Sequence, residues 1–223
     1  MSNEVKQISE RFLKDLSLLL KTAEQKLPQM NLLWHSESVA RYSKLAYEYL
    51  PEYEKKTWLI RNTMIPIPSD WIYTCGYYHD IGKAIILKLH EGMLEKEAFD
   101  DYDKMNIKEH TSFGSIILQV IATASGQLTD IDTPLFGMMN DACLYHHERM
   151  DGTGYMKMEG VHIPKISGLI AVADCFSAGV ETRPYKEHKL TEDMFKELKE
   201  MPLNQVYVNA LEKGIKEKSN IMK

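Results

Sequence analysis

The sequence predicts an all-α protein, because apolar residues recur at intervals of three and four along most of its length. No stretch shows the alternation of apolar and polar side chains that marks a half-buried strand, and no segment is repeated. No clear linker divides the 223 residues, so we expect a single packed unit. A chain of this length can bury about 70–75% of its unfolded surface, which is enough for a large core.

Three helices are predicted in the first half of the chain. We expect them over residues 2–28, 36–51 and 69–82, because prolines end the first two and a glycine closes the third. Their inward positions are Val5, Ile8, Phe12, Leu16, Leu19 and Leu20, then Val39, Tyr42, Ala46 and Tyr49, then Trp71, Ile72, Cys75 and His79.

The second half predicts further helices over residues 110–124, from Pro134 to about His146, from Pro164 through Asp174, and two at the C-terminus capped by Thr191 and Asn204. Residues 151–154 form a turn, since two glycines and an aspartate suit positive backbone angles. The inward positions include His110, Ile117, Ala142, His146, Ile170 and Asp174.

The composition is that of an acidic protein, with a formal net charge of −5 and a pI near 5.9. A long DNA or RNA partner needs a basic face and is therefore not expected, whereas a small anionic ligand is. No apolar run approaches the ~18 residues of a membrane span, and the first residues lack the pattern of a signal peptide. Cys75, Cys143 and Cys175 form no C-x-x-C pair, which fits a reducing compartment. We expect a soluble cytoplasmic protein without a membrane partner.

Several histidines and aspartates occupy positions that the helical spacing predicts to be buried in the core. His79, His110, His146 and Asp174 come from four separate helices. Burying one such group unpaired costs several kcal/mol, so four converging groups require a common partner, and a metal ion is the economical one. With the neighbouring Asp80 and His147, the set of imidazoles and carboxylates suits iron, manganese or zinc rather than calcium.

The run His79-Asp80-Ile81-Gly82-Lys83 places a lysine three residues after an aspartate. On a helical turn these two side chains share a face, so the ammonium stands beside the metal-binding carboxylate and can meet an incoming phosphate.

These motifs together resemble the HD-GYP branch of the HD-domain metal-dependent phosphohydrolases. The resemblance covers about residues 30–190, in the order of the family. It is carried by His35-Ser36-Glu37-Ser38-Val39-Ala40, His79-Asp80-Ile81-Gly82-Lys83, Glu109-His110, His146-His147-Glu148 with Asp151-Gly152-Thr153-Gly154-Tyr155, Ile163-Pro164, Val172-Ala173-Asp174 and Arg183-Pro184-Tyr185-Lys186.

The resemblance implies a single HD-domain helical bundle with extra N- and C-terminal helices, divided into an N-terminal helix (1–30) and the phosphohydrolase domain (31–223). It implies hydrolysis of cyclic di-GMP to pGpG, GMP or both through a hydroxide activated by two divalent ions, iron or manganese, with zinc as the alternative. The implied metal ligands are His35, His79, Asp80, His110, His146, His147 and Asp174.

Other roles are implied by the same match. Asp80 would bridge both ions and act in catalysis with Lys83, which also contacts the scissile phosphate. Tyr155, Arg183 and Lys186 would bind the substrate, and Glu148 is expected to orient a ligand histidine.

The chain departs from the family pattern at several positions. Met156 replaces the proline of Gly-Tyr-Pro, which is expected to loosen the loop that recognises the nucleotide. Gly168 replaces an arginine and Ser177 replaces an aspartate. We expect both changes to affect the ligand-binding side of the site more than the metal ligands. Asn31 replaces the glutamate that binds a third ion in some members, so two ions are favoured.

Two alternatives follow from these departures. One is a catalytically weak or inactive receptor or interaction module for cyclic dinucleotides. The other keeps the chemistry and acts on a different nucleotide phosphoester. A homodimer or a signalling partner protein is compatible with either.

Overall fold

The computed structural model describes residues 7–26, 28, 31–90, 92–93, 100–126, 128–180 and 190–221, and the described part is helical, as predicted. Its helices in chain order are α1 (Glu10–Lys26), α2 (Leu32–Glu48), α3 (Glu52–Lys55), α4 (Ser69–Tyr78), α5 (Lys83–Leu89), α6 (Asp101–Lys108), α7 (His110–Ala124), η3 (Leu128–Asp132), α8 (Pro134–Tyr145), η4 (Gly160–His162), α9 (Lys165–Val180), α10 (Thr191–Glu200) and α11 (Gln205–Ile221). Extended pairing among the described residues is limited to isolated bridges at Leu59 with Pro66 and Asp151 with Glu159. None of the helices in these ranges is both long and apolar enough to span a bilayer.

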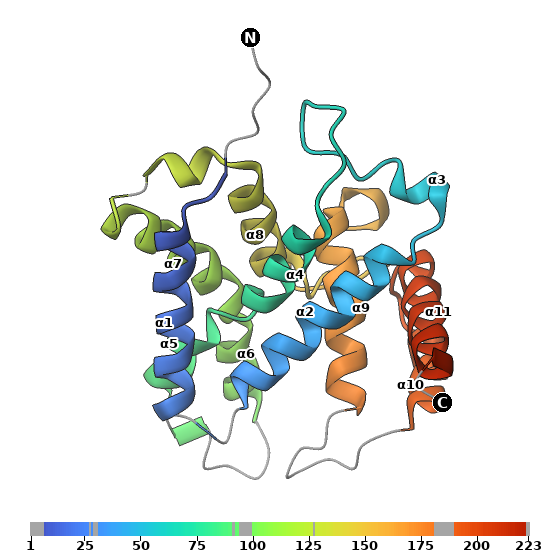
Figure 1. Ribbon diagram of the computed structural model, residues 1–223. Helices are drawn as coiled ribbons and strands as arrows, with labels where there is room; N and C mark the ends of the chain where they lie inside the picture. Colours follow the sequence, from blue (N-terminus) through green and yellow to red (C-terminus); the bar gives the residue numbers. More distant parts are fainter. Residues whose placement is uncertain are drawn as a thin grey trace.

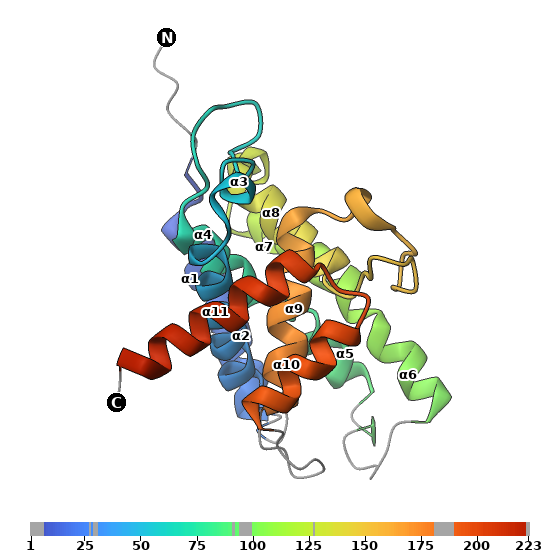
Figure 2. The same cartoon turned by 90° about the vertical axis from the view of Figure 1, so that its right-hand side faces the viewer.

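The bundle is organised around α2, α4 and α9. Helix α2 packs on α4, α9 and α11, while α1 packs beside α5 and α7 on the opposite flank (Figure 1). A second view shows α11 crossing in front of α2, with α10 beside it over α9 (Figure 2). Helix α9 is buried along most of its length, including Leu169, Ile170, Val172 and Ala173. Asp174 therefore lies on a helix whose other side chains form the centre of the core.

Helix α1 is joined to the rest of the core. Phe12, Leu16 and Leu20 are at most 1% exposed and belong to the same core cluster as α9. At the N-terminal end of α1, the amide and hydroxyl of Ser9 donate to the carboxylate of Asp130 at 3.2 and 2.6 Å. The boundary at residue 30 stays a prediction.

Helix α2 begins at Leu32, four residues before the predicted start. Asn31 has φ 51° and provides no side-chain cap. Glu24 of α1 replaces it, because its carboxylate accepts the Leu32 amide at 2.7 Å. This cap across two helices places His35 in the first turn of α2, and the local sequence pattern does not reveal it.

Helices α5 and α6 were not among the predicted elements. Helix α6 starts with a capping box in which the side chains of Asp100 and Asp103 accept each other's backbone amides at 2.9 and 3.0 Å. At the C-terminus, Asn204 caps α11 as predicted, since its side chain accepts the Val206 amide at 3.0 Å. Thr191 is instead the first residue of α10, after Leu190, and the predicted cap there is wrong by one position.

Candidate metal centre

All seven predicted metal ligands lie together where five helices meet. His35 is in α2, Asp174 is in α9, His79 and Asp80 follow α4, His110 begins α7, and His146 and His147 follow α8. Five of them are at most 4% exposed, namely His35, His79, Asp80, His110 and His146. The sequence prediction of one converging set agrees with this placement, while the role of each residue as a ligand stays a proposal.

Asp80 lies at the centre of the set, between two groups of imidazoles. Its Oδ2 atom is 3.6 Å from His35 Nε2 and 3.5 Å from His79 Nε2. Its Oδ1 atom is 3.1 Å from His110 Nε2 and 3.6 Å from His146 Nε2. One carboxylate therefore faces a different pair of imidazoles with each oxygen.

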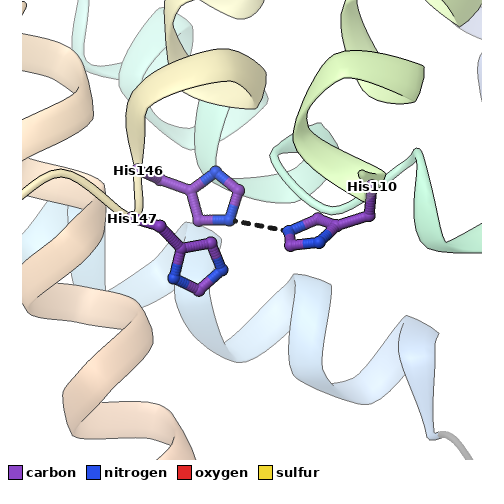
Figure 3. Close-up of side chains that lie close together, drawn as sticks. All are labelled: His110, His146 and His147. Carbon is purple, nitrogen blue, oxygen red and sulfur yellow. Dashed lines mark hydrogen bonds between the residues drawn. The ribbon is translucent and has the colours of Figure 1, made fainter. Parts of the chain in front are cut away.

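The group around Oδ2 also contains Asp174, whose Oδ1 lies 3.1 Å from His35 Nε2 and 4.0 Å from His79 Nε2. Among the described residues, the group around Oδ1 consists of imidazoles besides Asp80. There, His110 Nε2 and His146 Nε2 are 3.2 Å apart, and the ring of His147 lies beside them (Figure 3). In each of the sets His35, His79, Asp80 and His110, His146, His147, the potential ligand atoms lie within 4.8 Å of one another.

Three of the imidazoles are oriented by the main chain at the ends of helices. The Nδ1 atom of His79 pairs with the carbonyl of Gly76 at 2.7 Å, and that of His146 with the carbonyl of Ala142 at 2.8 Å. His110 Nδ1 pairs with the carbonyl of Ile107 in α6. Carbonyls in the last turn of a helix have no partner within the helix, so an imidazole placed just beyond it can donate its N–H to them. Each ring then turns its Nε2 atom toward Asp80.

This orientation fits a cation. A neutral imidazole that donates from Nδ1 carries a lone pair on Nε2, and these lone pairs point at carboxylate oxygens or, for His110 and His146, at each other. Facing lone pairs repel, and the buried His79 Nε2 and Asp80 Oδ1 atoms make no hydrogen bond within the described ranges. Two ligands each about 2.1 Å from one ion lie about 3.0–3.4 Å apart in octahedral or tetrahedral geometry. The observed separations between Asp80 and His110 and between the two imidazoles, 3.1 and 3.2 Å, fall in this range.

The electrostatics of the cluster favour the protonation states that bind metal. Burial lowers the pKa of His79 to about 3, and it also lowers the pKa of His110 and His147. Burial alone would raise the pKa of Asp80, but the Lys83 ammonium and the surrounding imidazoles hold it well below its usual range. Burial alone would also raise the pKa of Asp174, but the hydrogen bond from His35 and the charge interactions with His35 and His79 together lower it well below its usual range. Ionised carboxylates and neutral imidazoles are the forms that coordinate metal ions.

Lys83 lies beside Asp80 as the three-residue spacing predicts. Its ammonium donates to Asp80 Oδ2, and the lysine side chain is 20% exposed. The preceding Gly82 has a packing role that the sequence did not reveal, because a Cβ atom there would lie 1.9 Å from the carbonyl oxygen of His110. Only glycine lets this turn approach the first turn of α7.

The loop of residues 151–158, here called the Tyr155 loop, lies against the histidines. The ring of Tyr155 stacks on His147 with 4.5 Å between centroids and 25° between planes. Gly154 allows the approach, since an added Cβ would lie 2.5 Å from the Cα of Glu148. Tyr155 is thus placed at the half-buried edge of the cluster, next to a predicted ligand.

Glu148 holds this loop and does not orient a histidine as expected. Its carboxylate is 2% exposed and accepts the backbone amides of Met156 and Met158, both at 2.7 Å. This contact bears on the expectation that Met156 loosens the loop, which stays a prediction. A proline at position 156 would have no N–H to donate, so methionine adds an anchor that the Gly-Tyr-Pro pattern lacks.

Other predicted positions are placed as follows. Arg183 and Lys186 lie outside the described residues. Gly168 faces α11, where an added Cβ would lie 3.4 Å from the Tyr207 ring, and Ser177 is fully buried in α9. Arg149, which was not among the predicted site residues, donates from Nη1 to the carbonyls of Glu148 and His146 at 2.8 and 3.4 Å, in the turn that follows α8.

Residues 71–207 match the family model described as the HD domain, and the chain belongs to this family. HD domains are metal-dependent phosphohydrolases, in agreement with the donor set and the HD-GYP resemblance. The matched region contains six of the seven predicted ligands and leaves out His35.

The chain is also similar in sequence to several named phosphodiesterases. The chain is 38% identical over 128 residues to a cyclic di-GMP phosphodiesterase of Thermotoga maritima, an alignment that covers 55% of this chain and 30% of the relative. It is 29% identical over 188 residues to a cyclic di-GMP phosphodiesterase of Vibrio cholerae, covering 82% and 34%. A 3'3'-cGAMP-specific phosphodiesterase 1 of Vibrio cholerae is 31% identical over 117 residues, covering 52% and 24%. The chain thus spans between 24% and 34% of the length of these relatives.

A solved structure shares the fold. The crystal structure of the HD domain of the Listeria monocytogenes phosphodiesterase PgpH, in complex with cyclic-di-AMP, superposes with a TM-score of 0.52 and 15% identity. The superposition covers 92% of this chain and 96% of that domain.

Proposed function

We propose that this chain is a metal-dependent phosphodiesterase that hydrolyses cyclic di-GMP to pGpG, GMP or both. The observation that carries the proposal is the Asp80 carboxylate, which faces two pairs of imidazoles with its two oxygens. Relatives named as cyclic di-GMP phosphodiesterases support the choice of substrate.

The proposed centre holds two divalent ions that share Asp80. His35, His79 and Asp174 would complete the first site, and His110, His146 and His147 the second. Mixed nitrogen and oxygen donors suit iron or manganese, with zinc as the alternative. When bound, two such ions stabilise the charges that develop on the attacking and leaving oxygens of an in-line displacement at phosphorus.

Lys83 supplies the positive charge on the substrate side. Its ammonium now donates to Asp80 Oδ2, an oxygen that a bound ion would share. We expect the ammonium then to turn toward a phosphoryl oxygen, where negative charge grows as the transition state forms. Stabilisation that increases at this point accelerates the reaction and does not merely tighten binding.

Tyr155 provides an aromatic surface beside the second site, and its stacking on His147 sets where a nucleotide can lie. Arg183 and Lys186 are proposed to hold phosphate or guanine groups on the strength of their motif alone. The free cysteines support a reducing, cytoplasmic location, which stays a proposal, as does a homodimer or signalling partner.

The test is metal analysis and product assay on one sample of anaerobically purified protein. We expect about two transition ions per chain and conversion of cyclic di-GMP to pGpG or GMP. A panel with 3'3'-cGAMP and cyclic di-AMP ranks the substrates by rate. Two bound ions without turnover of any cyclic dinucleotide would contradict the proposal, and metal-free protein that still binds the nucleotide would favour the receptor alternative.

A further inference from the structure

Lys108 is a cation at the edge of the metal centre to which no role has yet been given. It is the last residue of α6, lies two positions before His110 and is exposed. Its ammonium lies 5.2 Å from the centroid of the Tyr155 ring. Among the described residues, no carboxylate lies within ion-pair distance of it, so its charge has no anionic partner in the protein there.

The backbone around Lys108 is tied to the centre. The Lys108 carbonyl accepts the hydroxyl of Thr111 at 3.0 Å, and the preceding carbonyl, that of Ile107, accepts Nδ1 of His110. The capping box at Asp100 fixes the other end of the same short helix. The lysine is therefore presented from a defined position, although its ammonium reaches solvent.

Tyr155 links Lys108 to the cations already described. One neighbour of its ring is His147, and another is the ammonium of Lys108. Burial raises the pKa of Tyr155, while the charges of Lys83 and Arg149 act to lower it, which places both cations within electrostatic reach of the phenol. Lys108 thus lies over the Tyr155 ring, and Lys83 and Arg149 are within electrostatic reach of the same side chain, at the edge of a centre proposed to bind a phosphodiester.

A cyclic dinucleotide carries two phosphates in one ring. When one phosphate meets the ions and Lys83, the macrocycle holds the second phosphate a short distance to the side. We propose that Lys108 binds this second phosphate, the one that is not cleaved. A lysine suits the task as a compact, flexible point charge, and its ammonium can leave the Tyr155 face when the anion arrives. This inference rests on the proposed phosphodiesterase function.

The test compares two substrates that differ in the second phosphate. Lys108→Met removes the charge and keeps an unbranched side chain. We expect its KM for cyclic di-GMP to rise about tenfold with little change in kcat, as for loss of a charged hydrogen bond. Its KM for bis(p-nitrophenyl) phosphate, which has one phosphate, should not change. Lys108→Arg should recover most of the affinity for cyclic di-GMP.

Lys104→Met is the matched control, because Lys104 is an exposed lysine of the same helix and pairs with the exposed Asp101. An unchanged KM for cyclic di-GMP in Lys108→Met would overturn the inference while leaving the phosphodiesterase in place. An equal rise for both substrates would also overturn it, since Lys108 would then act only by holding Tyr155. If the wild type neither binds nor hydrolyses cyclic dinucleotides, the proposed function itself fails, and this inference fails with it.

Discussion

The buried imidazoles and the Tyr155 loop lie side by side, yet different parts of the chain hold them in place. The imidazoles of His79, His110 and His146 are oriented by main-chain carbonyls at helix ends. Residues 156–158 of the loop are instead held by a side chain, because the Glu148 carboxylate accepts the backbone amides of Met156 and Met158.

This difference separates two proposed functions, metal binding and substrate recognition. Main-chain carbonyls persist when a neighbouring side chain changes, so the metal centre should tolerate substitutions around it. Residues 156 and 158 of the Tyr155 loop are held by the Glu148 carboxylate, so we expect that the proposed substrate recognition can fail while the proposed metal binding survives. Substitutions in each region test this separation.

The largest effect is expected at Asp80. Asp80→Asn keeps the shape of the side chain but removes the charge between the two groups of imidazoles. We expect loss of metal from the centre and a fall in kcat of about a thousandfold or more, because charge stabilisation is lost with the ions. Metal analysis and turnover of cyclic di-GMP measure both. Asp70→Asn, at an exposed carboxylate of α4, is the control, and an Asp80 variant that retains ions and full activity would refute the assignment.

The next effect is expected at Glu148. Glu148→Ala removes the acceptor of both loop amides, so Tyr155 loses its fixed position on His147. We expect KM for cyclic di-GMP to rise about tenfold, with the metal content unchanged. Substitution of the exposed Glu159 in the same way should alter neither quantity. Loss of metal in Glu148→Ala would mean that the two regions are not separable.

A smaller effect is expected at Met156. Met156→Pro restores the motif of the family but removes the N–H that donates to Glu148. We expect the free energy of unfolding to fall by about 1–2 kcal/mol, measured by urea denaturation. Met156→Leu keeps the N–H and should match the wild type. A gain in stability with proline would show that the fixed φ angle outweighs the hydrogen bond.

The smallest effect concerns pH and the metal-free protein. Burial lowers the pKa of His79 from 6.5 to about 3. The unfolded chain therefore takes up a proton as pH falls below 6.5, while the folded chain does not, and stability is lost in that direction. Between pH 7 and pH 5.5 we expect His79 to account for about 1 kcal/mol of this loss.

Urea denaturation of the metal-free protein at both pH values measures this loss, and His79→Asn should reduce it. The exposed His162 serves as control, because His162→Asn should leave the loss as in the wild type. A loss that is the same with and without His79 would argue against a neutral, buried imidazole at this position.

Much of the centre was predictable because its residues stand at inward helical positions. The spacing around His79, His110, His146 and Asp174 predicts burial, and shared burial predicts a common partner. His35 was found only through the family resemblance, because α2 begins earlier than the sequence pattern indicates and receives its cap from Glu24.

The roles of Glu148, Gly82 and Lys108 were not predictable in this way. Each depends on contact between segments that the local pattern treats as separate, such as the Gly82 turn against α7. Helical periodicity does not point to Lys108, because it marks buried positions and Lys108 is an exposed lysine at a helix end. Its position over Tyr155 exists only once α6 and the Tyr155 loop have been brought together.

The amino-acid sequence by itself determined the helical class, the inward set of imidazoles and carboxylates, and the proximity of Lys83 to Asp80, because these follow from helical periodicity. Tertiary structure decided that Asp80 lies between two groups of imidazoles and that Glu148 anchors the loop. The physical reason is that periodicity is local information. It indicates which face of one helix is buried, whereas the direction of a carboxylate oxygen is set by the groups that other helices place around it.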